Sequence, residues 1–274
     1  MKKPFSLLII ATGTLLMAFV PGQPVPQAPQ HATAPDFPSY TVNAFKLGEQ
    51  IVYRVHYGAI TAGDVVFRVD DQLHPYGNRK TYRFTVSAES ASSFEFIYKY
   101  KAWFDTYVDE KALFPWHYSR STNEGSYHYE DNVVFDHYNR QVKGRKGSFA
   151  IQPNTQDMIS VFYYARCLNF DRLTPGKIYK MPQTFLDDKM HAGAFRYYGK
   201  EVIKTPLGKI ETYKVAPVLD DGSVFHGEEE MKIWISADAN KIPVRITSPI
   251  VVGSIVVDLK SYENLNNPFT ALQG

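Results

Sequence analysis

The clearest pattern along the chain is a two-residue alternation of apolar and polar side chains between positions 94 and 104. Every second position there is apolar or aromatic: Phe94, Phe96, Tyr98, Tyr100, Ala102 and Phe104. The positions between them include Glu95, Lys99, Lys101 and Asp105. Because successive side chains of a strand point to opposite faces of a sheet, this pattern predicts a strand with one buried face.

Similar runs of β-branched and aromatic residues recur after position 40 and predict further strands. They lie at 51–57, 64–69, 81–88, 116–121, 125–130, 132–137, 148–151, 177–181, 194–203, 208–218, 229–236, 244–247 and 251–262. Turn-forming residues separate them, among them Gly58, Asp221 with Gly222, and Asp238 to Asn240. We therefore predict a mainly β fold, a large antiparallel curled sheet or barrel-like β-roll, because curling protects the edges of such a sheet.

One segment, 157–168, departs from this period and predicts the one substantial α-helix of the domain. Apolar residues recur there at near-helical spacing: Met158, Ile159, Phe162, Ala165 and Cys167 or Leu168. Asn154 and Thr155 are possible caps at its start. Asp157 and Arg166 flank the apolar stripe, and we expect them to pair with strand residues and hold the helix on the sheet. A structural ion pair is a more common role for such residues than a functional site.

The first residues have the pattern of an export signal. Lys2 and Lys3 precede an apolar run from Phe5 to Val20, which is shorter than the roughly 20 residues that span a bilayer. We therefore expect an exported protein, periplasmic or associated with the outer membrane. A retained anchor is the alternative, because Pro21 would hinder cleavage nearby. No cysteine follows the apolar run to carry a lipid, so a lipoprotein is not expected.

Composition changes along the chain and suggests its organisation. We predict a signal peptide over 1–22, a linker rich in Pro, Gln and Ala over 23–40, a single β-rich domain over 41–266 and a short tail over 267–274. A hydrophobic fraction of 44% and a charged fraction of 21% are those of a globular protein that buries a core.

Charge and cysteine content exclude several classes of partner and site. The formal net charge is +2, with scattered Lys and Arg, so no nucleic-acid partner is expected. Cys167 is the single cysteine, which excludes an intramolecular disulfide and a multi-thiolate metal site. We expect its thiol to behave as a small buried hydrophobic group.

Motifs for catalysis are absent from the sequence. The eight histidines form no H-E-x-x-H motif, although His128 and Glu130 would share a strand face, and there is no G-x-S-x-G elbow or P-loop. Carboxylates for glycoside cleavage could come from several positions: Asp105, Asp109, Glu110, Asp187, Asp188, Asp220, Asp221 or Glu228. We assign no catalytic residue, metal or cofactor, and a non-enzymatic role is favoured.

Aromatic residues, 15% of the chain, give the strongest indication of a ligand. The stripe that contains Phe96, Tyr98 and Tyr100 could line a concave cavity for a sugar ring or an acyl chain. The competing interpretation is that this stripe is the core of the domain. Trp103 would lie on the opposite face beside Lys99 and Lys101, where it could contact an anionic lipid or a glycan. The candidate ligand-binding residues are Phe96, Tyr98, Tyr100, Trp103 and Arg166.

Three stretches together carry a resemblance to a known family. The first comprises Phe45, Leu47, Gly48, Glu49, Ile51 and Tyr53, followed by Ala62 and Gly63. The second comprises Asp157, Ser160, Tyr163 and Arg166, and the third Trp234, Ser236, Asp238, Ile242, Pro243 and Arg245. In this order they resemble the bacterial domain of unknown function 3108 family. The resemblance implies an exported, mostly antiparallel β protein with a wide curled sheet, and it implies no reaction.

These observations favour an exported envelope protein that binds an amphipathic envelope ligand, a lipid or a glycan, in a curled β-sheet. Peripheral association with the envelope would follow from such a ligand. Two alternatives remain from the sequence: a polysaccharide-acting enzyme, either a lyase or a glycoside hydrolase, and a structural partner in envelope assembly.

Overall fold

The computed structural model describes residues 37–96, 98–218, 231–250 and 253–273. The predicted signal peptide, most of the predicted linker and the turn at Asp221 and Gly222 lie outside these residues. Within the described ranges, no helix has the length and apolar character needed to cross a membrane.

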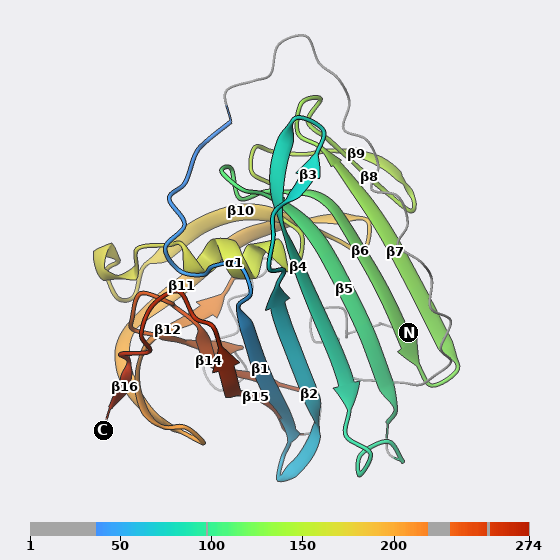
Figure 1. The fold of residues 1–274 in the computed structure, drawn as a ribbon. Coiled ribbons are helices and arrows are strands. Elements are labelled where there is room, and N and C mark those ends of the chain that lie inside the picture. The colour runs from blue at the N-terminus through green and yellow to red at the C-terminus, as the bar shows by residue number, and fades with distance from the viewer. Residues whose placement is uncertain (1–36, 97, 219–230, 251–252, 274) are drawn as a thin grey trace.

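The described strands form one 16-stranded sheet (Figure 1). They are β1 (Gln50–Tyr57), β2 (Ile60–Val69), β3 (His74–Tyr76), β4 (Arg79–Ser90), β5 (Tyr100–Asp109), β6 (Pro115–Glu124), β7 (Tyr127–Asp136), β8 (Gln141–Gly144), β9 (Gly147–Ala150), β10 (Ile178–Leu186), β11 (Lys189–Thr205), β12 (Gly208–Pro217), β13 (Lys232–Ser236), β14 (Pro243–Pro249), β15 (Ser254–Glu263) and β16 (Leu272–Gln273). The order across the sheet is β10-β11-β12-β13-β14-β15-β1-β2-β4-β5-β6-β7-β8-β9, and β3 and β16 pair with β4 and β12.

The sheet curls without closing, as the sequence predicts. Every pair of neighbouring strands is antiparallel, and β9 and β10, the two ends of the strand order, do not pair with each other in the described chain. The register shifts at several points, including Val55/His56 between β1 and β2 and Tyr107/Val108 between β5 and β6. Because such bulges bend a strand and increase its twist, they account for much of the curvature.

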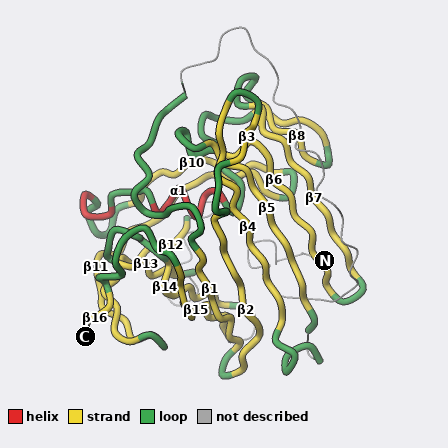
Figure 2. Tube along the Cα trace, viewed as in Figure 1, coloured by secondary structure: helices red, strands yellow, loops and turns green. Residues whose placement is uncertain are grey.

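The concave side of the sheet holds the core. Along β1, Ile51, Tyr53 and Val55 are buried, whereas the residues between them are partly exposed. The helix α1 (Ser160–Arg166) lies within the curve of the sheet, shown in red in Figure 2. Its Tyr163 ring stacks on Phe84 of β4 with the ring centroids 3.7 Å apart. The apolar stripe of the helix therefore covers the inner face of the sheet, as the sequence predicts.

The helix is shorter than the predicted range of 157–168, and its cap differs from the prediction. The Asp157 carboxylate accepts hydrogen bonds from the backbone N–H groups of Ile159 and Ser160 at 2.7 and 2.8 Å. It also accepts one from the Thr106 hydroxyl of β5 at 2.5 Å. The Asp157 carboxylate thus accepts the N–H groups at the start of the helix that Asn154 or Thr155 was expected to cap, and the chain before Ile159 turns instead of continuing the helix.

Two strand predictions need correction. Residues 94–96 and 98 are not in a strand, because β5 begins only at Tyr100 and the segment before it forms tight turns. The two strands predicted at 125–130 and 132–137 are one continuous strand, β7. Short strands without a strong alternation were missed, namely β3, β8 and β16.

The hairpin between β10 and β11 packs against the other end of the sheet. Asp187 and Asp188 form its tip, both with left-handed backbone angles (φ 51° and 57°). The Asp187 carboxylate pairs with Arg120 of β6 at 2.6 Å. Gly144 of β8 lies so close that a Cβ on it would be 2.2 Å from an Asp188 carboxylate oxygen. A side chain at position 144 would have to displace the Asp188 carboxylate, so the glycine favours this close packing of the hairpin tip on β8.

The predicted C-terminal tail is packed onto the sheet. Leu272 and Gln273 of β16 pair with Ile210 and Lys209 of β12, and Ala271 is buried.

Candidate functional site

Three connections lie at one end of the sheet and carry exposed apolar side chains. These are the β1–β2 turn, the β4–β5 loop and the β6–β7 turn, at the bottom of the view in Figure 1. Four large side chains are exposed there: Ile60 at 45%, Phe96 at 84%, Tyr98 at 39% and Tyr127 at 57%. We call these four residues the aromatic end.

The β4–β5 loop presents Phe96 to solvent because Phe94 anchors it. The Phe94 ring is buried in the main core cluster. The backbone N–H groups of Phe94 and Glu95 donate to the carbonyl of Ala91 at 2.8 and 3.1 Å, and that of Tyr98 donates to Phe94 at 3.0 Å. These turns break the two-residue alternation, so Phe94 and Phe96 point in different directions despite their spacing.

Charges beside the aromatic end compensate one another. Lys99 pairs with Glu95 at 3.5 Å, and Lys101 pairs with Glu89 at 3.2 Å. The Tyr98 hydroxyl donates to the carboxylate of Glu124. Since the two lysines are already paired, the sequence-based expectation of a basic surface for an anionic ligand is not favoured. The surface at this end of the molecule therefore offers exposed aromatic rings and no unpaired lysine among Lys99 and Lys101.

Behind the aromatic end, the sheet is filled. Tyr100, Ala102 and Phe104 are at most 3% exposed and belong to the main core cluster. The cavity beside Tyr100 is about 10 Å³, lined also by Val55 and Gly63, which leaves room for no more than a water molecule. The interpretation of this part of the stripe as core is therefore confirmed. Burial raises the pKa of the Tyr100 hydroxyl above its ordinary value, so the phenol stays neutral.

The five candidate residues from the sequence fall in three places. Phe96 and Tyr98 lie at the aromatic end, with Tyr100 buried behind them. Trp103 lies on the outer face of β5 and is 45% exposed, as the sequence predicts. Arg166 lies on α1, buried at 1% exposure. The structure brings the first three together and separates the other two from them.

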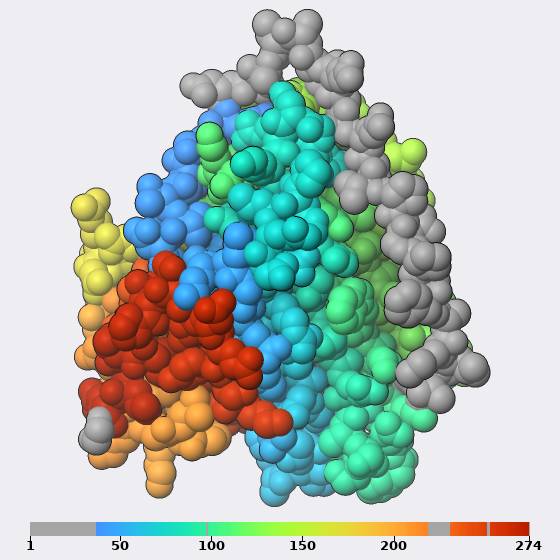
Figure 3. Space-filling model, viewed as in Figure 1, coloured from blue at the N-terminus to red at the C-terminus, as the bar shows by residue number. Residues whose placement is uncertain are grey.

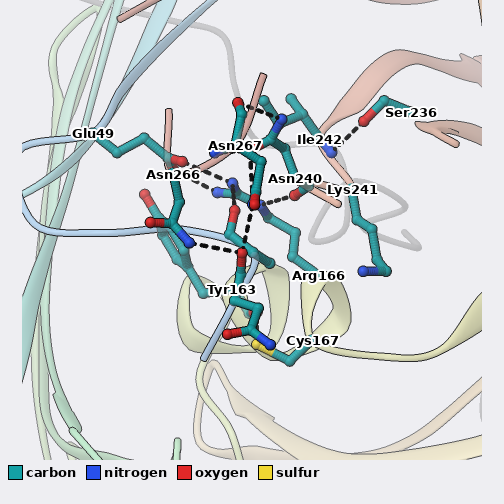
Figure 4. A network of polar contacts seen from close by, with 12 residues as sticks. Glu49, Tyr163, Arg166, Cys167, Ser236, Asn240, Lys241, Ile242, Asn266 and Asn267 are labelled. Atoms are coloured by element: carbon teal, nitrogen blue, oxygen red, sulfur yellow. Dashed lines mark hydrogen bonds and ion pairs between the residues drawn. The ribbon is translucent and has the colours of Figure 1, made fainter. Parts of the chain in front are cut away.

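Arg166 is the centre of a buried polar network (Figure 4). Its guanidinium donates to both carboxylate oxygens of Glu49, at 2.6 and 2.9 Å, and to the carbonyls of Ala44 and Asn240 at 2.7 and 3.0 Å. Asn240 in turn donates to the carbonyl of Asn267 at 3.1 Å. Arg166 thus joins the helix to the residue before β1 and to the β13–β14 turn. It forms a structural ion pair as expected, but its partner Glu49 lies just before a strand, and Asp157 contacts the sheet through a hydrogen bond from Thr106 and not through an ion pair.

The possible catalytic carboxylates are mostly engaged in ion pairs. Asp105 pairs with Arg83 at 2.5 Å, Asp109 with Arg79 at 2.6 Å and Asp187 with Arg120 at 2.6 Å. The positions Asp220, Asp221 and Glu228 lie outside the described residues. Glu110 and Asp188, the other described candidates, form no ion pair among the described residues, and a polysaccharide-acting enzyme stays a hypothesis from the sequence.

His128 and Glu130 share a face of β7, as expected from the sequence. The imidazole Nε2 lies 3.1 Å from the Glu130 carboxylate, and both side chains are exposed. In the part of the chain that the structure describes, no group of three or more His, Cys, Asp or Glu side chains converges to hold a metal ion.

A larger pocket, of about 220 Å³, lies at the opposite end of the sheet. Phe37, Phe114, Tyr138 and Arg140 contribute to its wall. None of the residues predicted from the sequence to bind a ligand lines it.

Sequence reasoning missed Ile60 and Tyr127 as members of the aromatic end. Both lie next to hairpin turns that Gly58 and Gly125 mark, and both glycines have left-handed backbone angles (φ 56° and 58°). A large apolar residue beside such a turn glycine is the signal that could have identified them.

Comparison with known proteins gives fold-level likenesses of low identity. No curated protein matches the chain. A β-barrel-like protein of the domain of unknown function DUF1849 from Brucella abortus is 11% identical, with a TM-score of 0.46, over 79% of this chain and 97% of that one. A Bacteroides fragilis protein with a YmcC-like fold, described as a candidate exported protein, is 13% identical, with a TM-score of 0.37. The match covers 83% of this chain and 98% of that one.

The family profile described as "Protein of unknown function (DUF3108)" matches residues 52–260, more than half of the chain. This match confirms the resemblance carried by the three stretches named above. The chain belongs to the DUF3108 family.

Proposed function

We propose that this is an exported cell-envelope protein that binds the surface of an amphipathic lipid assembly through its aromatic end. Export is supported by Lys2, Lys3 and the apolar run that follows them. A periplasmic or outer-membrane-associated location, and the absence of a lipid anchor, stay predictions from the sequence.

The observation that carries the proposal is the exposure of Phe96, Tyr98, Tyr127 and Ile60 on adjacent connections at one end of the sheet. Burying an exposed Phe side chain in an apolar medium gains about 1.5–3 kcal/mol. Tyr rings suit the membrane interface, because the ring is apolar and its hydroxyl reaches water. Four such side chains together are enough for reversible association with a lipid surface.

The filled interior determines how a lipid would be bound. Tyr100 and Phe104 occupy the space in which a ligand was expected to lie within the curled sheet. Binding therefore consists of insertion of the Phe96 loop among lipids, and the acyl chains remain in the lipid assembly. This is a peripheral association at the surface of the envelope.

Sedimentation with vesicles tests the proposal. The full chain after signal removal is mixed with vesicles of phosphatidylethanolamine and phosphatidylglycerol, and the bound fraction is measured as lipid concentration rises. We expect the Phe96→Ala variant to need about tenfold more lipid for half-binding, which corresponds to about 1.4 kcal/mol. Tyr198→Ala, which truncates an exposed ring on β11, is the matched control and should bind as the unaltered chain does. Equal binding of all three proteins, or no binding, would contradict the proposal.

A further inference from the structure

We propose that the outer face of β4 to β7 around Trp103 is a second binding site, which takes an uncharged glycan chain. The site is separate from the aromatic end. It lies on the convex side of the strands whose concave side packs against the helix. Figure 3 shows the face of the molecule on which β2, β4 and β5 lie side by side, coloured cyan to green.

Trp103 is a large apolar side chain whose cross-strand neighbours are polar. Its direct cross-strand neighbours are Ser87 on β4 and Ser121 on β6, and Ser121 is opposite Glu130 on β7. Serine side chains are too short to cover an indole, so the ring remains 45% exposed. Within the described residues, no other ring stacks on Trp103 and no acceptor meets its indole N–H. The indole is therefore an open apolar platform with one donor at its edge.

Polar side chains on the adjoining positions are held in place by one another. His128 Nδ1 lies 2.8 Å from the Asn123 amide oxygen, and His128 Nε2 lies 3.1 Å from Glu130. Lys101 pairs with Glu89. These contacts place donors and acceptors on both sides of the indole.

This combination fits a sugar chain better than other partners. The C–H face of a pyranose ring packs on an indole, and its hydroxyl groups exchange hydrogen bonds with hydroxyl, amide, imidazole and carboxylate groups. Polar positions across the strands repeat every 4.8 Å or so, comparable with the length of one sugar unit. A chain lying across β4 to β7 would meet Ser87, Trp103, Ser121 and Glu130 in order.

Charge balance argues for an uncharged chain. Lys101, the lysine beside Trp103, faces the carboxylate of Glu89, and the Glu130 carboxylate lies on the other side of the indole. An anionic polysaccharide would have to displace those carboxylates, whereas a neutral one can use them as acceptors. The site therefore selects hexose or N-acetylhexosamine chains without acidic groups.

Titration with defined oligosaccharides tests this site. Chitohexaose and maltohexaose are the probes, alginate is the anionic comparison, and heat of binding is measured on the full chain after signal removal. We expect at least one neutral hexamer to bind, with affinity at least tenfold lower in Trp103→Ala and partly restored in Trp103→Tyr. Tyr198→Ala is the control for removal of an exposed ring elsewhere and should bind normally.

Two further results separate the possible outcomes. Ser121→Lys is a second test that keeps the indole, for use if Trp103→Ala fails to fold. It places a long side chain beside Trp103 and should abolish glycan binding. Phe96→Ala should bind glycan normally, and Trp103→Ala should bind vesicles normally, so failure of the glycan site leaves the lipid proposal standing. The glycan proposal is overturned if neither hexamer binds at millimolar concentration, if binding survives Trp103→Ala, or if only alginate binds.

Discussion

Arg166 and Glu49 face each other as a bidentate ion pair, 2.6 and 2.9 Å between their nitrogen and oxygen atoms, with each side chain only 1% exposed. They lie 117 positions apart in the sequence. The contact ties the only α-helix of the described chain to the residue that precedes β1. Its position suggests that the helix depends on this pair for its place in the sheet.

Breaking this pair from one side should destabilise the protein strongly. Glu49→Gln leaves a buried guanidinium without its counter-charge, and a loss of about 3–5 kcal/mol in the free energy of unfolding is expected. Urea unfolding followed by circular dichroism measures it. The exposed pair Lys101 and Glu89 serves as control, because Glu89→Gln should change the free energy by no more than about 1 kcal/mol. Similar losses for both variants would contradict the structural role of Glu49.

Asp157 should make stability depend on pH. Burial raises the pKa of its carboxyl to about 6, against an ordinary 3.8. Because the folded state holds the proton more tightly, this carboxyl contributes stability below pH 4 that is lost as pH rises to 6. Asp157→Asn keeps an oxygen for the N–H groups of Ile159 and Ser160 and removes the titration. Relative to the unaltered chain, the variant should gain up to about 3 kcal/mol between pH 4 and 7.

Urea unfolding of Asp157→Asn and of the unaltered chain at several pH values from 4 to 7 measures the difference in their free energies of unfolding. The other titratable groups are the same in both proteins, so the pH dependence of the difference reports on Asp157. A constant difference across that range would show that Asp157 does not titrate there.

Cys167 should react slowly with thiol reagents. Burial is the main cause that raises the pKa of its thiol to about 11, from an ordinary 9.0, and the thiol donates weakly to the Tyr163 carbonyl. The thiolate fraction at pH 8 is then about a hundredfold lower than for an exposed cysteine, and the thiolate is the reactive form. A colorimetric disulfide reagent should modify the native chain about a hundredfold more slowly than the urea-unfolded chain. Equal rates would show that the thiol is accessible and ordinary.

Gly63 should not tolerate a side chain. A Cβ at this position would lie 2.3 Å from the carbonyl oxygen of Glu89 on the neighbouring strand β4. Gly63→Ala should therefore force β2 and β4 apart and lower the free energy of unfolding by about 1–3 kcal/mol. Ser87→Ala, on the same pair of strands with its side chain outward, should change it by no more than about 0.5 kcal/mol. An unchanged free energy of unfolding in Gly63→Ala would contradict this prediction, because it would mean that β2 and β4 can move apart without cost.

Much of the architecture could be predicted because a sheet with one buried face imposes alternation on the sequence. Along β1, Ile51, Tyr53 and Val55 alternate with outward residues and gave the right strand. The same rule failed at Phe94 and Phe96, where alternating aromatics lie in a turn, because Phe94 is buried by the loop fold and not by strand geometry. Alternation records which residues are apolar, and it does not record which backbone conformation buries them.

The candidate site could be predicted only in part, for a related reason. The exposure of Trp103 follows from strand periodicity and was expected. The exposure of Phe96 depends on a turn that is closed by hydrogen bonds to the Ala91 carbonyl. The spacing of apolar residues in the sequence does not reveal such a turn. Arg166 was expected to make an ion pair, but its partner Glu49 lies too far away in sequence for periodicity to identify it.

Insertion of the Phe96 loop into lipid can be measured most directly with a tryptophan at its tip. The variant Phe96→Trp, combined with Trp103→Phe to remove the exposed native indole, is mixed with vesicles that contain brominated lipid. We expect the emission to shift to shorter wavelength and to be quenched by bromine, whereas Tyr198→Trp in the same background shows neither change. Emission at position 96 that is unaltered by saturating vesicles would contradict binding through the aromatic end.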